Sequence, residues 1–265
     1  MQGRFERLNM LLAIDIGNTH TVFGLFGNKQ LVEHWRLFSE INRTEDEIAA
    51  TLAYLLQKKK VSLDDVNGIC ISSVVPDLTS VYQYLAQRYF KITPLIINHD
   101  LDLSVKIVYK NPDAVGSDRL CNAVAGVKYY GKPLIIIDFG TASVIDCINP
   151  QGDYLGGVIM PGISSSINTL HKRAAKLPKV ELTFPEHIIG RSTDESIQSG
   201  ILYGTVFMLE GFIQSIQNDF GKNTRVVATG GMAGQIAERM DAIDHVDPSL
   251  NLKGIALIYS KNRKL

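Results

Sequence analysis

The chain has 265 residues, which is enough for one large domain or two domains of about 130 residues each. Its 27 Lys and Arg side chains balance 27 Asp and Glu side chains, so it lacks the excess positive charge with which nucleic-acid-binding proteins neutralise phosphates. A hydrophobic share of 45% and a charged share of 20% predict a folded chain with a sizeable core. We therefore expect no nucleic-acid partner.

Cysteine content and apolar run length indicate a protein of the reducing cytoplasm without a membrane partner. The three cysteines are too few and too scattered for a disulfide framework or a tetrahedral zinc site. The longest apolar runs, such as residues 134–137, have the length of a buried strand and are too short to cross a bilayer. Residues 1–9 mix charged and apolar side chains, so we expect an extension outside the fold and no signal peptide.

The first half of the chain predicts three antiparallel strands followed by alternating helices and strands. Turn residues Gly17-Asn18 and Gly27-Asn28 separate the first three expected strands. Thr44 and Glu47 form a capping box, which predicts the start of a helix. Strands are expected at 11–14, 21–26, 31–37, 69–75 and 95–97, and a second helix at about 78–89. This order predicts a mixed sheet with helices packed on it.

The second half restarts the same pattern, which indicates an internal duplication. Residues 12–17 match residues 135–140, and a threonine follows shortly after in both places. Strands are expected at 134–137, 144–148, 154–159 and 226–228, and helices from Gly116, at 163–175, after Thr193, at 232–240 and at 252–261. The predicted fold class is therefore α/β with a duplicated mixed β-sheet flanked by helices. We expect domains at 10–116 and 117–265.

The motif Asp15-Ile16-Gly17-Asn18-Thr19 lies where a strand turns into the next one. A carboxylate there can hold Mg²⁺ or its water, and glycine lets the backbone approach a ligand closely. Exposed N–H groups with Asn and Thr side chains suit a triphosphate. The same residues are also common in ordinary hairpin turns. A second copy, Asp138-Phe139-Gly140-Thr141, favours a phosphate-holding function for both.

Two further glycine-containing motifs have a structural and a functional interpretation. Gly116-Ser117-Asp118-Arg119 lies at a predicted helix start. An Asp at such a place is often only a helix cap. An adjacent Asp and Arg can also provide a general base and a cation that binds an anionic group, as phosphoryl transfer uses them. Thr229-Gly230-Gly231 joins a strand to a helix, either as a tight turn or as a nucleoside contact.

Small residues on two predicted helices indicate close helix packing. Ala123 and Gly126 lie on the helix after Gly116, and Gly200, Gly204 and Gly211 lie on the long helix after Thr193. Such a face fits either packing within a domain or a two-fold interface between subunits.

The chain resembles type III pantothenate kinase, within the acetate kinase, sugar kinase, heat-shock chaperone and actin superfamily. The resemblance rests on four motifs in this order: Asp15–Thr19, Gly116–Arg119, Asp138–Ala142, and Gly156-Gly157 with Pro161-Gly162. The resemblance runs from Met10 to about Lys261. It implies two ribonuclease-H-like domains with an inter-domain active cleft, and a homodimer. It also implies ATP-dependent phosphorylation of pantothenate to 4'-phosphopantothenate, the first committed step of coenzyme A biosynthesis.

Carried over motif by motif, the resemblance also implies roles for single residues. Asp118 would be the general base, Asp15 would lie close to Mg²⁺, and Asp138 would hold a monovalent cation, K⁺ or NH₄⁺. The implied ATP-binding residues are Asp15, Ile16, Gly17, Asn18, Thr19, His20, Thr21, Val22 and Thr141. The implied pantothenate-binding residues are Tyr109, Gly116, Ser117, Asp118, Arg119 and Thr193. Ser117 stands where the family more often has an apolar small residue.

Two other functions remain open at this point. One is an ATP-binding regulatory factor of the same superfamily that lacks kinase activity, and the other is a kinase for a different small hydroxyl substrate. Asp118 together with Arg119 favours a kinase, because a pure binder would not need both. The superfamily fold by itself does not fix the substrate.

Overall fold

Each half of the chain builds a five-stranded mixed sheet. The computed structural model describes residues 10–173 and 177–263; the expected extension at 1–9 lies outside them. In the first sheet the order is β3-β2-β1-β4-β5, with β1 antiparallel to β2 and parallel to β4. Its strands are β1 (Met10–Ile16), β2 (His20–Gly27), β3 (Gln30–Phe38), β4 (Val66–Ser73) and β5 (Leu95–Ile96).

The second sheet repeats the topology of the first. Its order is β10-β9-β6-β7-β8, with β6 antiparallel to β7 and parallel to β9. Its strands are β6 (Leu134–Phe139), β7 (Ala142–Ile148), β8 (Tyr154–Pro161), β9 (Arg225–Gly230) and β10 (His245–Val246). Read from β8, it has the strand order and directions of the first sheet read from β3, which confirms the predicted duplication. The short strand β10 was not predicted.

Seven α-helices are found in the described residues, close to where the sequence predicts them. They are α1 (Glu45–Lys58), α2 (Pro76–Leu85), α3 (Ser117–Tyr130), α4 (Ile163–Arg173), α5 (Thr193–Phe220), α6 (Ala233–Ala237) and α7 (Leu250–Asn262). The capping box of α1 is present, since Thr44 and Glu47 exchange both hydrogen bonds. After α2 the chain continues in a π-helical turn, Ala86–Phe90. Positions 174 and 175 of the predicted fourth helix lie outside the described residues.

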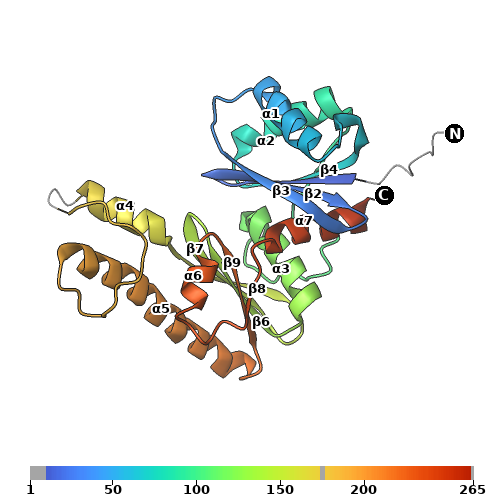
Figure 1. Cartoon of the computed structure of the whole chain (residues 1–265). Coiled ribbons are helices and arrows are strands. Elements are labelled where there is room, and N and C mark those ends of the chain that lie inside the picture. The colour runs from blue at the N-terminus through green and yellow to red at the C-terminus, as the bar shows by residue number, and fades with distance from the viewer. Residues whose placement is uncertain (1–9, 174–176, 264–265) are drawn as a thin grey trace. The chain divides into compact units, whose positions relative to one another are not determined.

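The first sheet has a helix layer on each face (Figure 1). Leu12, Ile14 and Ile16 are alternate residues of β1, so they lie on one face of the sheet and pack in a core with α1 and α2. On the opposite face, a Cβ at Gly68 of β4 would overlap the Tyr259 ring of α7. These contacts leave residues 11, 13 and 15 of β1 on the α7 face.

The second sheet also carries apolar helices on its faces. Ile135 and Ile137 of β6 pack in a core with α5 residues Leu202, Val206 and Leu209. On the other face, Gly126 of α3 lies against Leu134 and Ile136, where a Cβ would come within 2.7 Å of both side chains. The small residue Gly126 of α3 thus serves packing inside this unit, and Ala123 of the same helix is fully buried.

The two compact units are not continuous in sequence, in contrast to the expected division at 116/117. The first comprises Met1–Ser104, Lys110–Ala125 and Leu250–Leu265, and the second Val105–Tyr109 and Gly126–Ser249. Helix α3 begins in one unit and ends in the other. Helix α7 returns to the first unit because its apolar side packs on the first sheet, with Leu252 against Gly24 of β2.

Candidate functional site

The turn after β1 is tight and presents polar atoms to solvent. Asp15, the last residue but one of β1, is half-buried, whereas Asn18 and Thr19 are exposed. The Gly17 N–H donates to the His20 carbonyl at 3.0 Å, and a Cβ on Gly17 would lie 3.1 Å from that same oxygen. Glycine therefore allows the close turn, at which the Asn18 and Thr19 side chains are exposed to solvent.

Not every residue predicted to bind ATP offers its side chain. Ile16 belongs to the core, and Thr21 is fully buried with its Oγ1 hydrogen-bonded to Ser39 Oγ at 2.9 Å. Either residue could therefore contact a nucleotide only through its backbone. The His20 ring packs on Phe38 with 5.0 Å between ring centroids. Burial, with the nearby Arg36 charge, lowers the pKa of His20, so it is neutral at pH 7. Val22 is half-buried.

The predicted acceptor motif forms the first turn of α3. Asp118 is the second residue of this helix, so it is not the N-cap, although its charge is favourable near a helix N-terminus. Its Oδ1 accepts the Arg119 backbone N–H at 2.8 Å, and its carbonyl accepts Asn251 Nδ2 of α7 at 3.2 Å. A Cβ at Gly116 would overlap Asp118 Oδ1, which explains the glycine.

Burial makes Asp118 a stronger base than an ordinary aspartate. Loss of hydration raises the pKa of its carboxyl, and the Arg119 backbone N–H and guanidinium charge offset part of that rise. Arg119 is itself 8% exposed, and its positive charge acts on the Asp118 carboxyl. This combination of base and cation is what phosphoryl transfer to a hydroxyl requires.

Buried serines connect the two motifs of the first unit. Ser72, at the end of β4, donates to Asp15 Oδ1 at 3.0 Å and lies 3.0 Å from Ser117 Oγ. The structure thus brings Asp15 and the first turn of α3 to the same end of the first sheet. Sequence reasoning missed Ser72. Its position at the carboxyl end of a strand beside β1 was the available signal, because parallel strands end at the same sheet edge.

The hairpin after β6 repeats the first one in the second unit. Asp138 is again the last residue but one of its strand and half-buried, and Thr141 is exposed. The Gly140 N–H donates to the Ala142 carbonyl at 3.1 Å, as Gly17 does to His20. Gly230 has φ +89°, and a Cβ there would lie 2.7 Å from Asp138 Oδ1. The predicted Gly-Gly turn therefore leaves room for this carboxylate.

The two hairpins offer oxygen donors, which suit hard cations. Mg²⁺ commonly binds one or two carboxylates together with substrate phosphates and water, so Asp15 fits a Mg²⁺–nucleotide complex. The Asp138 carboxylate, seated against Gly230, and nearby backbone carbonyls are donors of the kind K⁺ prefers. Within 10–173 and 177–263 there is no group of three or more His, Cys, Asp or Glu that could hold a metal ion.

In the second unit, the Tyr109 ring lies beside Tyr154 and Gly156. Its ring lies 6.4 Å from that of Tyr154, whose hydroxyl donates to buried Asp146 at 2.8 Å. Gly156 has φ +101°, and a Cβ there would come within 2.7 Å of Tyr109 Cδ2. Glycine is thus required both by the backbone and by the ring beside it. Thr193, another implied pantothenate-binding residue, is exposed as the first residue of α5.

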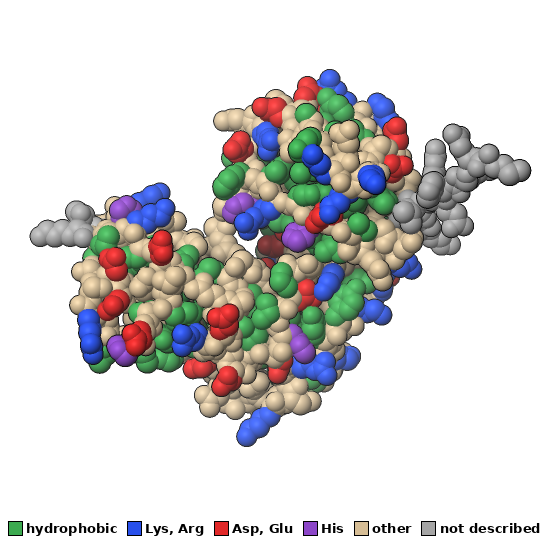
Figure 2. Space-filling model, viewed as in Figure 1, with side chains coloured by type: hydrophobic (Ala, Val, Ile, Leu, Met, Phe, Trp, Pro, Cys, Tyr) green, Lys and Arg blue, Asp and Glu red, His purple; other side chains and the backbone are tan. Residues whose placement is uncertain are grey.

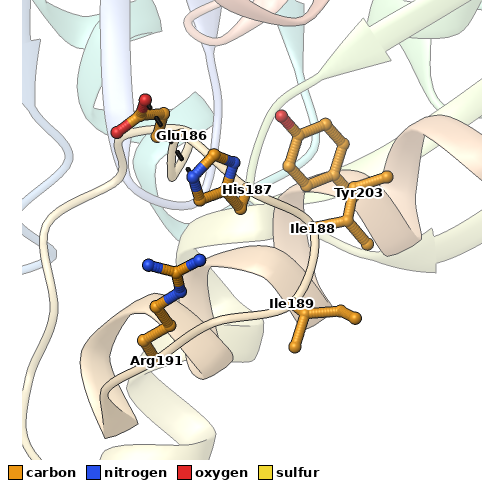
Figure 3. A pocket seen from close by; sticks show the side chains of 6 residues that line it. All are labelled: Glu186, His187, Ile188, Ile189, Arg191 and Tyr203. Atoms are coloured by element: carbon orange, nitrogen blue, oxygen red, sulfur yellow. Dashed lines mark ion pairs between the residues drawn. The ribbon is translucent and has the colours of Figure 1, made fainter.

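A hollow of about 630 Å³ lies beside the amino-terminal half of α5 and contains none of the predicted site residues (Figure 3). Tyr203 of α5 lines one side, and the preceding loop supplies the rest, including His187 and Glu186 in a 4.0 Å ion pair. Ile188 and Ile189 are 57% and 83% exposed. Because its loop residues are largely open to solvent, the hollow lacks the enclosed polar groups of a catalytic pocket.

Charges of both signs are interspersed over the face seen in Figure 2. The described Lys and Arg side chains on that face alternate with Asp and Glu, in line with the balanced composition. In the described part of the chain, no helix is both long enough and apolar enough to span a membrane.

Comparison of the sequence with family models finds one match. The model described as type III pantothenate kinase matches residues 11–215, which is most of the chain. The matched segment includes both Asp-Gly-Thr hairpins, the first turn of α3 and β8 with Gly156.

Solved structures with the same architecture share little sequence with the chain. A candidate Baf family transcriptional activator from Campylobacter jejuni has 18% identity and a TM-score of 0.63, covering 96% of this chain and 100% of its own. The ethanolamine utilization protein EutJ from Carboxydothermus hydrogenoformans has 13% identity and a TM-score of 0.53, covering 93% and 89%. The Lmo2764 protein from Listeria monocytogenes, a candidate N-acetylmannosamine kinase, has 13% identity and a TM-score of 0.52, covering 95% and 98%. The chain has the α/β, actin-like two-domain fold of such proteins, as predicted.

Proposed function

Because the chain belongs to the type III pantothenate kinase family, we propose that it transfers the γ-phosphoryl group of ATP to the terminal hydroxyl of pantothenate. Family membership supports phosphoryl transfer and a place in coenzyme A biosynthesis. The choice of pantothenate as acceptor is the finer part of the proposal. It rests on the match of Gly116–Arg119 to the family's acceptor motif.

One observation carries the proposal. Within the first unit, the hydrogen bonds of Ser72 join the Asp15 carboxylate of the nucleotide-type hairpin to the helix turn that bears Asp118 and Arg119. A carboxylate suited to Mg²⁺–ATP and a carboxylate suited to proton abstraction thus belong to one rigid polar cluster. A protein that only bound nucleotide would need the first of these groups and not the second.

In the proposed reaction, Asp118 acts on the acceptor hydroxyl. The hydroxyl oxygen forms a bond to the γ-phosphorus, its proton passes to the Asp118 carboxylate, and the bond from that phosphorus to the bridging oxygen breaks to release ADP. The raised pKa of Asp118 makes this proton transfer more favourable than it would be to an exposed aspartate. Arg119 offers its charge to an anionic group of the substrate.

The two hairpins bind the phosphates and their cations in this proposal. Asp15 and the polar atoms of residues 17–19 hold the triphosphate with Mg²⁺, and Thr141 contacts ATP from the second hairpin. Asp138 holds K⁺ or NH₄⁺. The bound cations, when present, neutralise charge on the phosphoryl oxygens. Tyr109, held by Gly156, and Thr193 contact pantothenate.

We further propose that two copies of the chain associate through α5. Gly200, Gly204 and Gly211 have open space where a Cβ would be, so none of the three packs within its own unit. Phe207 and Met208 between them are 54% and 43% exposed. Spaced at three or four residues, these positions form one helix face on which a second helix could approach closely.

The proposal is tested by an acceptor panel. ADP release is measured with a coupled assay in Mg²⁺ and K⁺, with pantothenate set against a panel of sugars and short hydroxy acids. We expect pantothenate to give the highest kcat/KM. A better rate with a sugar would assign a different acceptor to the same chemistry. Tight ATP binding without acceptor-dependent ADP release would instead indicate a regulatory nucleotide-binding protein.

A further inference from the structure

Asp15 has a buried hydroxyl directly beside it. In the parallel pairing of β1 with β4, Asp15 stands opposite Ser72, so both side chains leave the same face of the sheet. Ser72 is 0% exposed, and its Oγ donates to Asp15 Oδ1 at 3.0 Å. A buried hydroxyl is costly unless its hydrogen bonds are made, so this one holds the carboxylate oxygen in a defined direction.

Ser117 extends this contact to α3. It is the first residue of the helix and 7% exposed. Its Oγ lies 3.0 Å from Ser72 Oγ, accepts the Ser73 N–H at 2.8 Å and donates to the Ser73 carbonyl at 3.0 Å. A serine hydroxyl carries one hydrogen. Because that of Ser72 goes to Asp15, the Ser72 oxygen can only accept at its contact with Ser117, and the single Ser117 hydrogen is shared between that oxygen and the Ser73 carbonyl.

The duplicated unit has a similar pair. In the parallel pairing of β6 with β9, Asp138 stands opposite Thr229, which is 3% exposed. A buried hydroxyl residue therefore stands beside the hairpin carboxylate in both copies of the fold. The recurrence of a buried hydroxyl opposite the carboxylate in both units argues that this position serves the carboxylate.

We propose that Ser72 and Ser117 are positioning residues that fix the Asp15 carboxylate for the Mg²⁺–nucleotide complex and hold it in register with the first turn of α3. The inference rests on the proposed nucleotide-binding function of Asp15. Ser72 makes the direct contact and carries most of the effect. Ser117 acts through Ser72, so its hydroxyl has the smaller effect.

The test is nucleotide binding by calorimetry, measured with Mg²⁺ and again in EDTA. We expect Ser72→Ala to weaken ADP binding about tenfold in Mg²⁺, as loss of a hydrogen bond to a charged group does, and to leave binding in EDTA unchanged. Ser72→Thr, which keeps the hydroxyl as Thr229 does in the other unit, should restore the affinity. If Ser72→Ala fails to fold, Ser72→Cys, with its weaker donor, should give the same Mg²⁺-dependent loss.

A double-mutant cycle separates positioning from simple burial. Ser117→Ala should weaken binding about twofold to threefold, and Ser117→Ala in the Ser72→Ala background should add nothing, because the two hydroxyls act in series. Ser199→Ala, which removes a buried hydroxyl bonded to the Ile188 carbonyl in the other unit, is the matched control. It should leave ADP binding unchanged.

The outcomes distinguish this inference from the proposed function. If the parent protein shows no Mg²⁺-dependent ADP binding, the proposed function and the inference both fail. If the parent binds and Ser72→Ala binds equally well, only the positioning inference is overturned. Equal losses in Mg²⁺ and in EDTA, or fully additive effects of the two serine substitutions, would also overturn it, because they would indicate a structural effect alone.

Discussion

Replacing the proposed base, Asp118→Asn, should remove catalysis without harming the fold. The substitution is nearly isosteric, and the Asn side-chain oxygen can still accept the Arg119 N–H that Oδ1 accepts at 2.8 Å. Burial raises the pKa of Asp118, so at neutral pH folding must bury a charge that water would stabilise. Removing that charge should leave Tm at pH 7 equal to or above that of the parent protein.

The loss of activity follows from the chemistry that is removed. A positioned general base contributes about 10²–10⁴-fold, so kcat should fall by that factor, or about 3–5 kcal/mol in activation free energy. Nucleotide affinity should stay within a few-fold of the parent, because Asp15 and not Asp118 belongs to the nucleotide hairpin. The effect should therefore appear in kcat and leave ADP binding unaffected.

The assay combines initial rates of ADP release, calorimetry with ADP and thermal unfolding of the same preparations. Asp113→Asn is the matched control, because Asp113 is an exposed carboxylate just before the same motif, with its Oδ1 3.2 Å from the His99 ring. It should retain the parental kcat. An Asp118→Asn variant that turned over within a few-fold of the parent would refute the base assignment, and a parallel loss of ADP binding would refute the division of roles.

Three further outcomes are expected. As the pH is lowered, kcat should begin to fall at a pH above the range in which an ordinary aspartate is protonated. Burial raises the pKa of Asp118, and only its ionised form accepts a proton. A fall in kcat only at or below about pH 4 would contradict this. Initial rates at constant Mg²⁺ should depend on K⁺ or NH₄⁺, and Asp138→Asn should abolish that dependence. Full activity with Na⁺ as the only monovalent cation would contradict the cation assignment. In sedimentation, Gly204→Arg should yield folded monomer, whereas Gly234→Arg, equally open on α6, should stay dimeric. A parent protein that is a fully active monomer at micromolar concentration would rule out the interface.

The repeated part of the fold could be predicted from the sequence. Residues 12–17 and 135–140 carry the same strand-Asp-Gly pattern, and strand ends followed by Gly-Asn or Gly-Thr predict hairpins wherever they occur. These are local signals, because the turn residues and the apolar alternation lie within a few positions of each other. Nine of the ten strands of the two sheets accordingly lie close to where the sequence predicts them, and β10 is the exception.

Contacts between segments that are distant in the sequence could not be predicted from such local signals. Ser72 meets Asp15 only because β4 lies parallel to β1 in that register, and nothing in the local sequence of Ser72 distinguishes it from a strand-end serine. The return of α7 to the first unit depends on the fit of Leu252 over Gly24. Gly126 and Gly204 look alike in sequence, yet the first packs on Ile136 and the second faces open space.

The identity of the phosphorylated product tests the central claim most directly. The protein is incubated with ATP, Mg²⁺, K⁺ and pantothenate, and the products are examined by mass spectrometry and phosphorus NMR. The account predicts one equivalent of ADP and one of pantothenate carrying a phosphoryl ester on its terminal hydroxyl, with neither formed by Asp118→Asn. Release of ADP with inorganic phosphate alone, or no reaction with pantothenate under conditions where ATP binds, would contradict it.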